Sequence, residues 1–487
     1  MKRRDFFSSE PMITSLTGGR WFCPLPEKTG ENARFRVSTD SRVLEPGDVF
    51  VALRGEKFDG HDFLKQAEAK GAVLVIIDRE EAAETLNAKG GTGVLIVKNT
   101  VTALGQLAKG YRETLNGLRV VAVTGSNGKT TTKRLIHAGL SVKMRGSASP
   151  KSFNNHIGVP LTVLAAEDDD EYLVAEIGSN AKGEIRELAE IVQPEIAVIT
   201  TIGISHVAGL GSLRGVCEEK LDLLRVMGRG GKAVLNTEAP LLQEVMKEDP
   251  VLRGYLPGGD EVSRWFSLEK TGAADLYAEK IRCRPGGTEC TTSAGSELKL
   301  KLLGRHNAGN ALAALLTTEL LGIEAAEAIP GMERILPEAM RFTPEEVNGI
   351  TFYNDAYNAN PDSTRAALRT FAEVTSPARD RVIVLGDMLE LGEVSEEAHR
   401  EIACFLVRMI RDGLTVRQVI LTGEMMEKVV DEIAAVVDTR WTAASSGEPA
   451  RVVYDLIKPG DQVLLKGSRG LSLERIAEMT GEGSMDR

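Results

Sequence analysis

The sequence predicts an α/β protein built from three domains, and three observations carry this prediction. The chain has 487 residues, which is more than one hydrophobic core usually supports. Short apolar runs alternate with helical patterns along most of its length, as in parallel sheets that helices cover on both faces. Hydrophobic residues make up 42% and charged residues 26% of the chain, as in ordinary globular proteins.

Residues 1–116 are predicted to form a small α/β domain. Apolar runs at 73–77 (VLVII) and 94–97 (VLIV) are predicted strands, and the pattern over 62–70 is typical of a helix. Residues 102–114 predict a further helix, which would link this domain to the next one.

Residues 117–336 are predicted to form the central domain. Its predicted strands lie at 119–123, 172–177, 196–200 and 233–235, with helical stretches between them. This rhythm indicates a parallel sheet. Residues 250–305 are rich in turns and in alternating segments, so we expect antiparallel strands at the edge of that sheet.

Residues 337–487 repeat the α/β rhythm and predict a third domain. Strands are expected at 382–385, 419–421 and 463–465, and each is followed by a glycine-containing turn. In sheets of this kind, ligands bind beyond the carboxyl ends of the strands. The segment KGSRG, which follows the last of these strands, offers Lys466 and Arg469 as a clamp for a carboxylate or a phosphate.

Charge and cysteine content exclude several classes of function. A net charge of −11 leaves no basic surface of the kind that nucleic acids or anionic membranes require. The five cysteines are odd in number and form no CxxC pair, which favours a reduced compartment without a zinc site. The basic start, MKRRDFFSSEPM, is not followed by an apolar segment, and no apolar run is long enough to span a membrane. We expect a monomeric, cytoplasmic enzyme.

The segment VVAVTGSNGKTTTK, residues 120–133, is the strongest functional signal. An apolar run ends in a glycine-bearing turn, and a helix then begins near Lys129. Backbone N–H groups in such a turn, together with the helix dipole, favour a phosphate. The two glycines enclose two residues, where the common phosphate loop has four. The predicted nucleotide-binding residues are Gly125, Ser126, Asn127, Gly128, Lys129, Thr130 and Thr131.

Three further side chains follow predicted strands of the central domain. Glu176 ends one strand and would hold Mg²⁺ beside the phosphate loop, or would be a salt-bridge partner. His206 lies in a glycine-rich loop that we expect to face a ligand, although a lone histidine is more often structural. Lys220 shares a helical face with apolar residues, where it would either extend its amine to solvent or have a lowered pKa and be modified.

Polar side chains also precede two predicted helices. Asn307 and Asn310 open the helix of GRHNAGNALAALL, where amides could read a purine edge or cap the helix. The segment YNDAYNANPDS, residues 353–363, is richer in polar residues than a simple connector, and Asn360 is predicted to cap a helix that starts at Pro361.

These motifs together resemble the Mur ligase family. TGSNGKTTTK, AEIGSN, the HVAGLGS loop with Lys220, HNAGNALAAL, YNDAYNANPDS, LGDMLELGE and KGSRG occur in that family's order and cover nearly the whole chain. Residues 38–63 are similar to the family's UDP-binding domain. The resemblance implies an N-terminal UDP-binding domain, a central ATPase domain with antiparallel edge strands, and a Rossmann-like C-terminal domain.

The resemblance also implies an activity. Within the family, YNANPDS followed by GDMLELGE resembles the member that uses ATP to add D-Ala-D-Ala to UDP-MurNAc-tripeptide through an acyl phosphate. Lys129 would contact the phosphates, and Thr130 and Glu176 would hold a Mg²⁺. His206 and a carbamylated Lys220 would serve a second Mg²⁺.

The resemblance assigns the other site residues by position. The expected contacts are Asn307 and Asn310 for adenine; Arg341 and Asp355 for ribose or phosphate; Asn358, Asn360 and Ser363 for the dipeptide; Ser41 and Arg42 for the uridine nucleotide; Asn154 and Asn155 for the muramyl-peptide; and Lys466 and Arg469 for substrate.

Three positions depart from the family's usual pattern, and three alternatives remain. Arg341 lies in AMRF where Gly-Arg-Met is usual, Asp222 replaces a glutamate, and His156 receives no role. The alternatives are the ligase that adds the third amino acid, a folylpolyglutamate synthetase, and a phosphate-loop ATPase of another class. The N-terminal domain argues against the folate enzyme, and the short glycine spacing argues against an ordinary ATPase.

Overall fold

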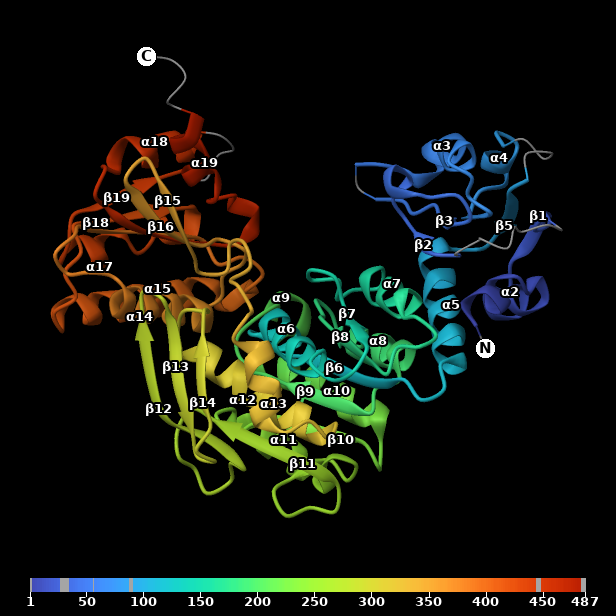
Figure 1. Ribbon diagram of the computed structural model, residues 1–487. Helices are drawn as coiled ribbons and strands as arrows, with labels where there is room; N and C mark the ends of the chain where they lie inside the picture. The colour runs from blue at the N-terminus through green and yellow to red at the C-terminus, as the bar shows by residue number, and fades with distance from the viewer. Residues whose placement is uncertain (1, 27–34, 56, 87–90, 444–447, 483–487) are drawn as a thin grey trace.

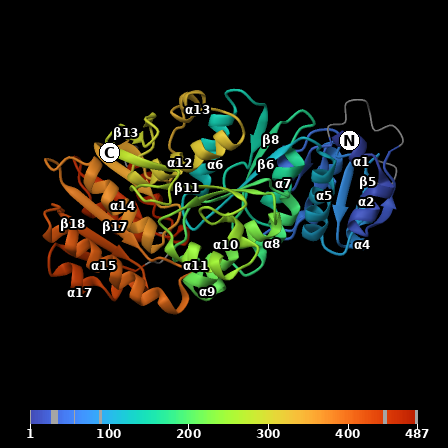
Figure 2. The same ribbon diagram turned by 90° about the horizontal axis from the view of Figure 1, so that it is seen from below.

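The computed structural model describes residues 2–26, 35–55, 57–86, 91–443 and 448–482. Within these residues it has three mostly parallel sheets, which lie in a row in chain order (Figure 2). We name the parts of the chain that carry them the first unit (residues 2–114), the central unit (119–332) and the third unit (343–482). The predicted α/β class with three parts is confirmed.

The first unit holds a sheet of five strands among the described residues, in the order β1-β5-β4-β3-β2. The predicted strands appear as β4 and β5, and the predicted linking helix is α5. Glu56, within the segment similar to a UDP-binding domain, lies outside the described residues. The elements are α1 (Arg3–Phe7), α2 (Glu10–Thr17), β1 (Arg20–Cys23), β2 (Val37–Ser38), β3 (Val49–Val51), α3 (Leu64–Ala69), β4 (Leu74–Ile77), α4 (Glu80–Ala83), β5 (Gly93–Ile96) and α5 (Thr100–Thr114).

The central unit holds a nine-stranded sheet in the order β14-β13-β12-β11-β10-β9-β6-β8-β7 within the described chain. All four strands predicted for its parallel part are present, as β6, β8, β9 and β10. The strands are β6 (Arg119–Thr124), β7 (Gly146–Ala148), β8 (Tyr172–Glu176), β9 (Ile196–Ile199), β10 (Lys232–Asn236), β11 (Val262–Ser267), β12 (Leu276–Arg284), β13 (Gly287–Thr292) and β14 (Glu297–Leu300).

One prediction for the edge of this sheet was wrong in part. Strand β13 is antiparallel to its neighbours β12 and β14 as expected, but β11 pairs in parallel with both β10 and β12. The chain passes from β10 to β11 through helix α11 (Pro240–Glu248), and a helical crossover returns the chain in the parallel direction. The turn-rich composition of residues 250–305 therefore conceals one more parallel strand.

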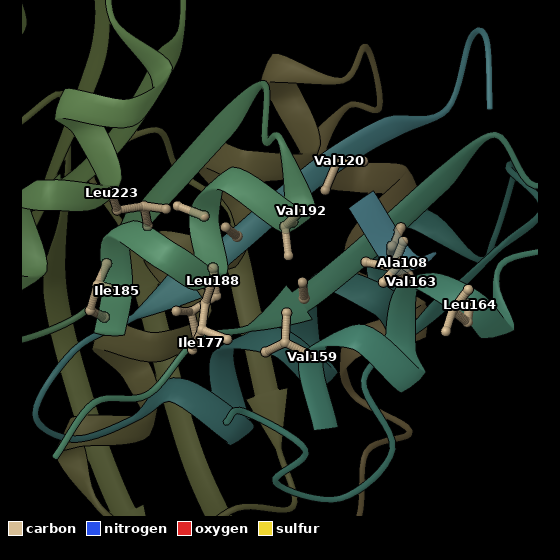
Figure 3. Packing of buried hydrophobic residues seen from close by; sticks show 14 of the residues in the cluster. Ala108, Val120, Val159, Val163, Leu164, Ile177, Ile185, Leu188, Val192 and Leu223 are labelled. Carbon is tan, nitrogen blue, oxygen red and sulfur yellow. The ribbon is translucent and has the colours of Figure 1, made fainter. Parts of the chain in front are cut away.

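Helices cover both faces of the central sheet because its strands alternate their apolar side chains. Val120 and Ala122 of β6 belong to one cluster of buried residues, and Val121 and Val123 belong to another. Figure 3 shows the first cluster, where α7, α8 and α10 meet the sheet. The helices are α6 (Lys129–Leu140), α7 (Gly158–Ala165), α8 (Glu184–Val192), α9 (Val207–Leu210), α10 (Leu213–Met227), α12 (Arg305–Leu320) and α13 (Ala325–Met332).

The first and central units share one apolar core. A single cluster of buried residues runs from Phe6 through α5 to Trp265 of β11. Helices α5 and α7 contact each other, and Ala108 and Val163, labelled in Figure 3, both belong to this cluster. The Tyr111 hydroxyl of α5 donates to the carbonyl of Ala166, 3.0 Å away. We conclude that α5 attaches the first unit firmly to the central sheet.

The third unit has its own two core layers. Its sheet has the order β15-β16-β20-β17-β18-β19 within the described chain, and all neighbours except β15 and β16 are parallel. The predicted strands are β17, β18 and β20. The elements are β15 (Thr343–Val347), β16 (Ile350–Asp355), α14 (Pro361–Val374), β17 (Arg381–Gly386), α15 (Ser395–Arg411), β18 (Gln418–Thr422), α16 (Glu424–Glu427), α17 (Val430–Ala434), β19 (Thr439–Thr442), α18 (Glu448–Leu456), β20 (Gln462–Lys466) and α19 (Arg475–Glu482).

The third unit meets the central unit at several places. Strands β12 to β14 extend from the central sheet toward α14 and α15 (Figure 1). The half-buried Cys283 of β12 packs against the core cluster that lies beneath these two helices. Other contacts lie at the phosphate loop and at the loop that contains His206, around the candidate site.

In the described part of the chain, no helix is both long and apolar enough to cross a lipid bilayer.

Tyr111 offers a test of the attachment between the first two units. Tyr111→Phe removes one hydrogen bond to the Ala166 carbonyl, but Arg3 still donates to that oxygen at 2.7 Å. We expect a loss of about 1 kcal/mol. Tyr111→Ala also removes the ring that packs on Phe6 and Phe7, so we expect a loss of about 3–5 kcal/mol. Hydrogen exchange of the α5 amides measures both losses, and equal effects of the two variants would contradict the packing role.

Candidate active site

A cavity of about 470 Å³ lies where the central and third units meet. Its size is typical of a site for a small ligand or a nucleotide. Most of the side chains predicted from the sequence line it, although they come from segments more than 300 residues apart. These residues are Ser126, Asn127, Gly128, Lys129, Thr130, Thr131, Asn154, Asn155, Glu176, His206, Asn307, Asn310, Arg341, Asp355, Asn358, Asn360, Ser363 and Lys466.

Five predicted site residues do not line this cavity. Gly125 comes directly before the loop residues that line the cavity. Lys220 lies on α10 and is not among the lining residues. Ser41 and Arg42 belong to the first unit, where Ser41 bonds to Gln66 and Arg42 pairs with Asp40 on the surface. Arg469 pairs with Glu474 at 2.8 Å, so KGSRG does not direct both of its cations into the cavity.

The phosphate loop has the build that the sequence predicts. Strand β6 ends at Thr124 and helix α6 begins at Lys129. Gly128 has a φ of 82°, in the left-handed region. A Cβ at Gly128 would lie 2.3 Å from the Asn310 side-chain oxygen. Only glycine fits this turn, because both the backbone angle and the space exclude a side chain.

The loop that follows β9 holds the phosphate loop in place. The Ser126 hydroxyl donates to the Gly203 carbonyl at 2.8 Å, and the Ser126 amide donates to the Thr201 carbonyl at 2.9 Å. The Lys129 ammonium donates to the Gly125 carbonyl at 2.8 Å. Burial lowers the pKa of Lys129, while nearby Glu176 favours its charged form. The loop is therefore preorganised around one cation.

Two contacts join the phosphate loop to residues that follow the central unit. The amides of Asn127 and Asn360 pair reciprocally, at 2.8 and 3.3 Å. Arg341 donates to the Thr130 hydroxyl at 3.0 Å, and its guanidinium lies 4.1 Å from the centre of the Tyr357 ring. These contacting groups also line the cavity, and a bound ligand could replace the contacts between them.

Glu176 and Thr130 offer side-chain oxygens at the phosphate loop that could bind a metal ion. Glu176 is buried, and its two carboxylate oxygens accept from Asn154 and Lys133, each at 3.0 Å. The salt bridge expected for Glu176 is confirmed, and the residue also lines the cavity, while its role as a Mg²⁺ ligand stays a prediction. Carboxylate and hydroxyl oxygens are ligands that suit Mg²⁺. The described residues contain no group of three or more His, Cys, Asp or Glu side chains arranged for a metal ion.

His206 and Lys220 lie on the other side of the loop. His206 Nδ1 is 2.6 Å from a carboxylate oxygen of Glu390, which follows β17. Burial lowers the pKa of His206, which favours the neutral ring that could bind a metal. Lys220 is 2% exposed, and burial, with Lys129 nearby, lowers its pKa to about 7. In the part of the chain that the structure describes, Lys220 has no hydrogen-bond or ion-pair partner.

Asn307 and Asn310 form a short chain of amides on α12. Asn307 donates to the Leu303 carbonyl at 2.8 Å and accepts from Asn310 at 3.0 Å. The Asn310 oxygen accepts from Thr132 and touches the space that a Cβ at Gly128 would take. In this structure, Asn310 thus packs against Gly128 and bonds to Thr132, and so supports the phosphate loop.

The polar segment before α14 is held by a buried lysine. Lys466 pairs with Asp355 at 2.7 Å and donates to the Asn358 carbonyl at 2.7 Å. The predicted cap is confirmed. The Asn360 side chain accepts from the Ser363 amide at 2.9 Å, and Pro361 is the first residue of the helix. Lys466 therefore shapes this wall of the cavity.

Sequence reasoning missed several residues of the site, of which four contact or neighbour the predicted side chains most closely. Lys133 pairs with Glu176, Glu390 contacts His206, Tyr357 lies under Arg341, and His306 lines the cavity. Lys133 lies one helical turn after Lys129, so its spacing was a signal that could have identified it. Glu390 and Tyr357 meet His206 and Arg341 only in the folded chain, so no local pattern reveals them. His306 directly precedes the predicted Asn307, whose amide is 3.2 Å from its ring.

The fold and the cavity define a nucleotide-binding protein of the phosphate-loop class. Three family models match the chain: Mur ligase family, catalytic domain, over residues 36–112; Mur ligase middle domain, over 123–318; and Mur ligase, glutamate ligase domain, over 340–469. A Bacillus subtilis (strain 168) protein named UDP-N-acetylmuramoyl-tripeptide--D-alanyl-D-alanine ligase is 35% identical over 450 residues, which are 91% of this chain and 92% of that protein. The chain belongs to the Mur ligase family.

Solved structures agree with this assignment. The crystal structure of MurF from Acinetobacter baumannii is similar with a TM-score of 0.79 and 28% identity, covering 96% of this chain and 98% of that one. MurF ligase from Thermotoga maritima, solved in complex with ADP, is similar with a TM-score of 0.73 and 27% identity, covering 93% and 99%.

The lowered pKa of Lys220 predicts a pH dependence of stability. Between about pH 7 and its ordinary pKa of 10.5, the unfolded chain holds a proton on Lys220 that the folded chain has released. The unfolded state binds more protons in this window, so folding stability rises with pH there. We expect the stability of the wild type, relative to Lys220→Met, to increase from pH 7 to 10. Denaturant unfolding in CO₂-free buffer measures it, and a difference that does not change with pH would contradict the lowered pKa.

Proposed function

We propose that the protein is an ATP-dependent ligase that joins D-Ala-D-Ala to UDP-MurNAc-tripeptide in the synthesis of a peptidoglycan precursor. One observation carries this proposal: a phosphate loop and a second, polar wall from another unit face the same cavity. The names of the similar proteins support the choice of substrates. Proteins of this family that add a single amino acid remain the nearest alternative.

We propose that the nucleotide binds with its phosphates on the 125–131 loop. Amides at the start of α6 and the Lys129 ammonium would stabilise the negative charge. Asn307 would lie beside the adenine, and Asn310 would act by holding Gly128 in place. Arg341 and Asp355 would approach the ribose or the phosphates from the other wall of the cavity.

The oxygen donors beside the loop fit a magnesium ion. Thr130 and Glu176 would hold it, and the ion would supply positive charge that offsets repulsion between the phosphates and the attacking carboxylate. His206 and Lys220 would serve a second ion. Burial lowers the pKa of both side chains, which favours the neutral imidazole of His206 and the neutral amine of Lys220.

We propose that Lys220 is carbamylated. Its neutral amine would attack CO₂, forming a nitrogen–carbon bond and releasing one proton to solvent. The product carries a negative charge, which would interact favourably with the nearby ammonium of Lys129, whereas a protonated Lys220 would be repelled by it. The absence of a partner for Lys220 within the described residues supports this assignment.

The peptide substrates would approach from opposite sides of the loop. The tripeptide carboxylate would attack the γ-phosphate, ADP would leave, and the dipeptide amine would then displace phosphate from the acyl phosphate to form the amide. Asn154 and Asn155 lie on the side of Glu176, and Asn358, Asn360 and Ser363 lie on the side of α14. The uridine nucleotide would contact Ser41 and Arg42, and Lys466 and Arg469 would shape the dipeptide side.

We propose domain boundaries at residues 116/117 and 336/337. The chain ranges of the three sheets support them, since no sheet crosses either boundary within the described residues. The cytoplasmic location and the monomeric state stay predictions from the sequence.

Release of phosphate from ATP tests the proposed reaction directly. The assay contains Mg²⁺ and omits UDP-MurNAc-tripeptide and D-Ala-D-Ala in turn. We expect release only when both are present, and a product heavier by one dipeptide residue in mass spectrometry. Release with a single amino acid instead of the dipeptide would assign the neighbouring step, and release that needs neither substrate would favour an ATPase of another class.

The carbamate on Lys220 has its own spectroscopic test. We expect ¹³C NMR of the protein in ¹³C-bicarbonate to show a carbamate carbon that is missing in Lys220→Met, and we expect this variant to lose ligation. Lys182→Met provides a control with an exposed lysine. A variant without Lys220 that keeps full ligation, or a wild type without the carbamate signal, would disprove the modification.

A further inference from the structure

Lys133 is a buried cation to which the proposed reaction gives no role. It lies on α6, one turn after Lys129, and is 1% exposed. Its ammonium is 3.0 Å from a carboxylate oxygen of Glu176 and also donates to the Lys151 carbonyl. Burying a lysine is costly, so this one is matched by a charge that must also be buried.

Each oxygen donor assigned to Mg²⁺ is therefore already bonded to a cation. Glu176 is bonded to Lys133, and the Thr130 hydroxyl accepts from Arg341. Arg341 follows the central unit and would leave if the third unit moved away. Lys133 belongs to the same helix as the phosphate loop and would stay.

We propose that Lys133 is a positioning residue that balances the charge of Glu176 before the nucleotide arrives, so that Mg²⁺ binds only together with the polyphosphate. This inference rests on the proposed function, which places Mg²⁺ at Glu176. Without nucleotide, a divalent ion meets one carboxylate surrounded by the ammonium groups of Lys133 and Lys129. The phosphates reverse the sign of this field, because they bring several negative charges to the same place.

Lys133 also fixes where the carboxylate points. It connects α6, Glu176 at the end of β8, and the segment that contains Lys151. Asn154 of that segment holds the other carboxylate oxygen. The carboxylate thus enters the reaction already oriented, and the ion need not order it.

The test is the response of thermal stability to MgCl₂ without nucleotide. In Lys133→Met, Glu176 becomes a buried charge that keeps its bond from Asn154 but has lost its ion-pair partner, so we expect a lower melting temperature that MgCl₂ raises by a few degrees. We expect the wild type to respond no more to MgCl₂ than to NaCl of equal ionic strength. A wild type that MgCl₂ stabilises as strongly as the variant, or a variant that does not respond, would overturn the proposal.

Three further variants separate charge balance from a merely structural role. Lys133→Arg keeps the charge, and we expect it to behave as the wild type does. The double variant Lys133→Met/Glu176→Gln removes both charges, and we expect it to lose the response to MgCl₂. Lys143→Met removes an exposed lysine that pairs with Glu327, and we expect no response. A response in the double variant would place the ion elsewhere and would overturn the proposal.

A titration of the wild type needs no variant. Electron paramagnetic resonance distinguishes free from bound Mn²⁺. We expect Mn²⁺ to stay free up to millimolar concentration without nucleotide and to bind once ADP is added. Tight binding of Mn²⁺ without ADP would overturn the proposal. Failure of the proposed ligase would show separately, as phosphate release that does not depend on the peptide substrates.

Discussion

The paired amides of Asn127 and Asn360 connect the phosphate loop to the start of α14, and the rest of the site depends on this contact. It brings the wall formed by Asp355, Asn358 and Lys466 to face the loop that holds Lys129. Arg341 makes the second connection, through the Thr130 hydroxyl. Neither the loop nor the polar wall encloses a nucleotide alone, because the cavity exists only where both are present.

The three units are joined by different kinds of contact. An unbroken apolar cluster runs from the first unit through α5 into the central sheet, so separating these units would expose much apolar surface. Cys283 of β12 packs on the core of the third unit, but the contacts at the site are polar. The third unit and the linking residue Arg341 meet the phosphate loop and His206 through hydrogen bonds and an ion pair, which water can replace. We infer that movement of the third unit is the easier motion, and that it opens and closes the site.

Charge is distributed to suit this arrangement. The chain carries a net charge of −11, yet Lys129, Lys133, Lys220 and Arg341 gather around the loop. Carboxylates such as Glu338 and Asp362 line other parts of the cavity. The cations beside the loop thus offset the protein's negative charge where a polyphosphate would bind.

Much of the fold and the site could be predicted from the sequence, where the signal was local. Apolar runs gave the strands β6, β8, β9, β10, β17, β18 and β20, and the cap at Asn360 followed from the asparagine and proline alone. The direction of β11 was not predicted, because a turn-rich segment separates this strand from the helix that brings the chain back into the parallel direction. The partners of Glu176 and His206 were missed because Lys133 and Glu390 meet them only in three dimensions.

The central claim is that the central and third units hold the nucleotide together. A crystal structure with ADP and Mg²⁺ tests it most directly. The account predicts the β-phosphate on the amides of residues 125–130 and on Lys129, with at least one contact from Arg341, Asp355 or Lys466 across the cavity. ADP bound by the phosphate loop with the third unit turned away in every copy, or ADP bound outside this cavity, would contradict the account.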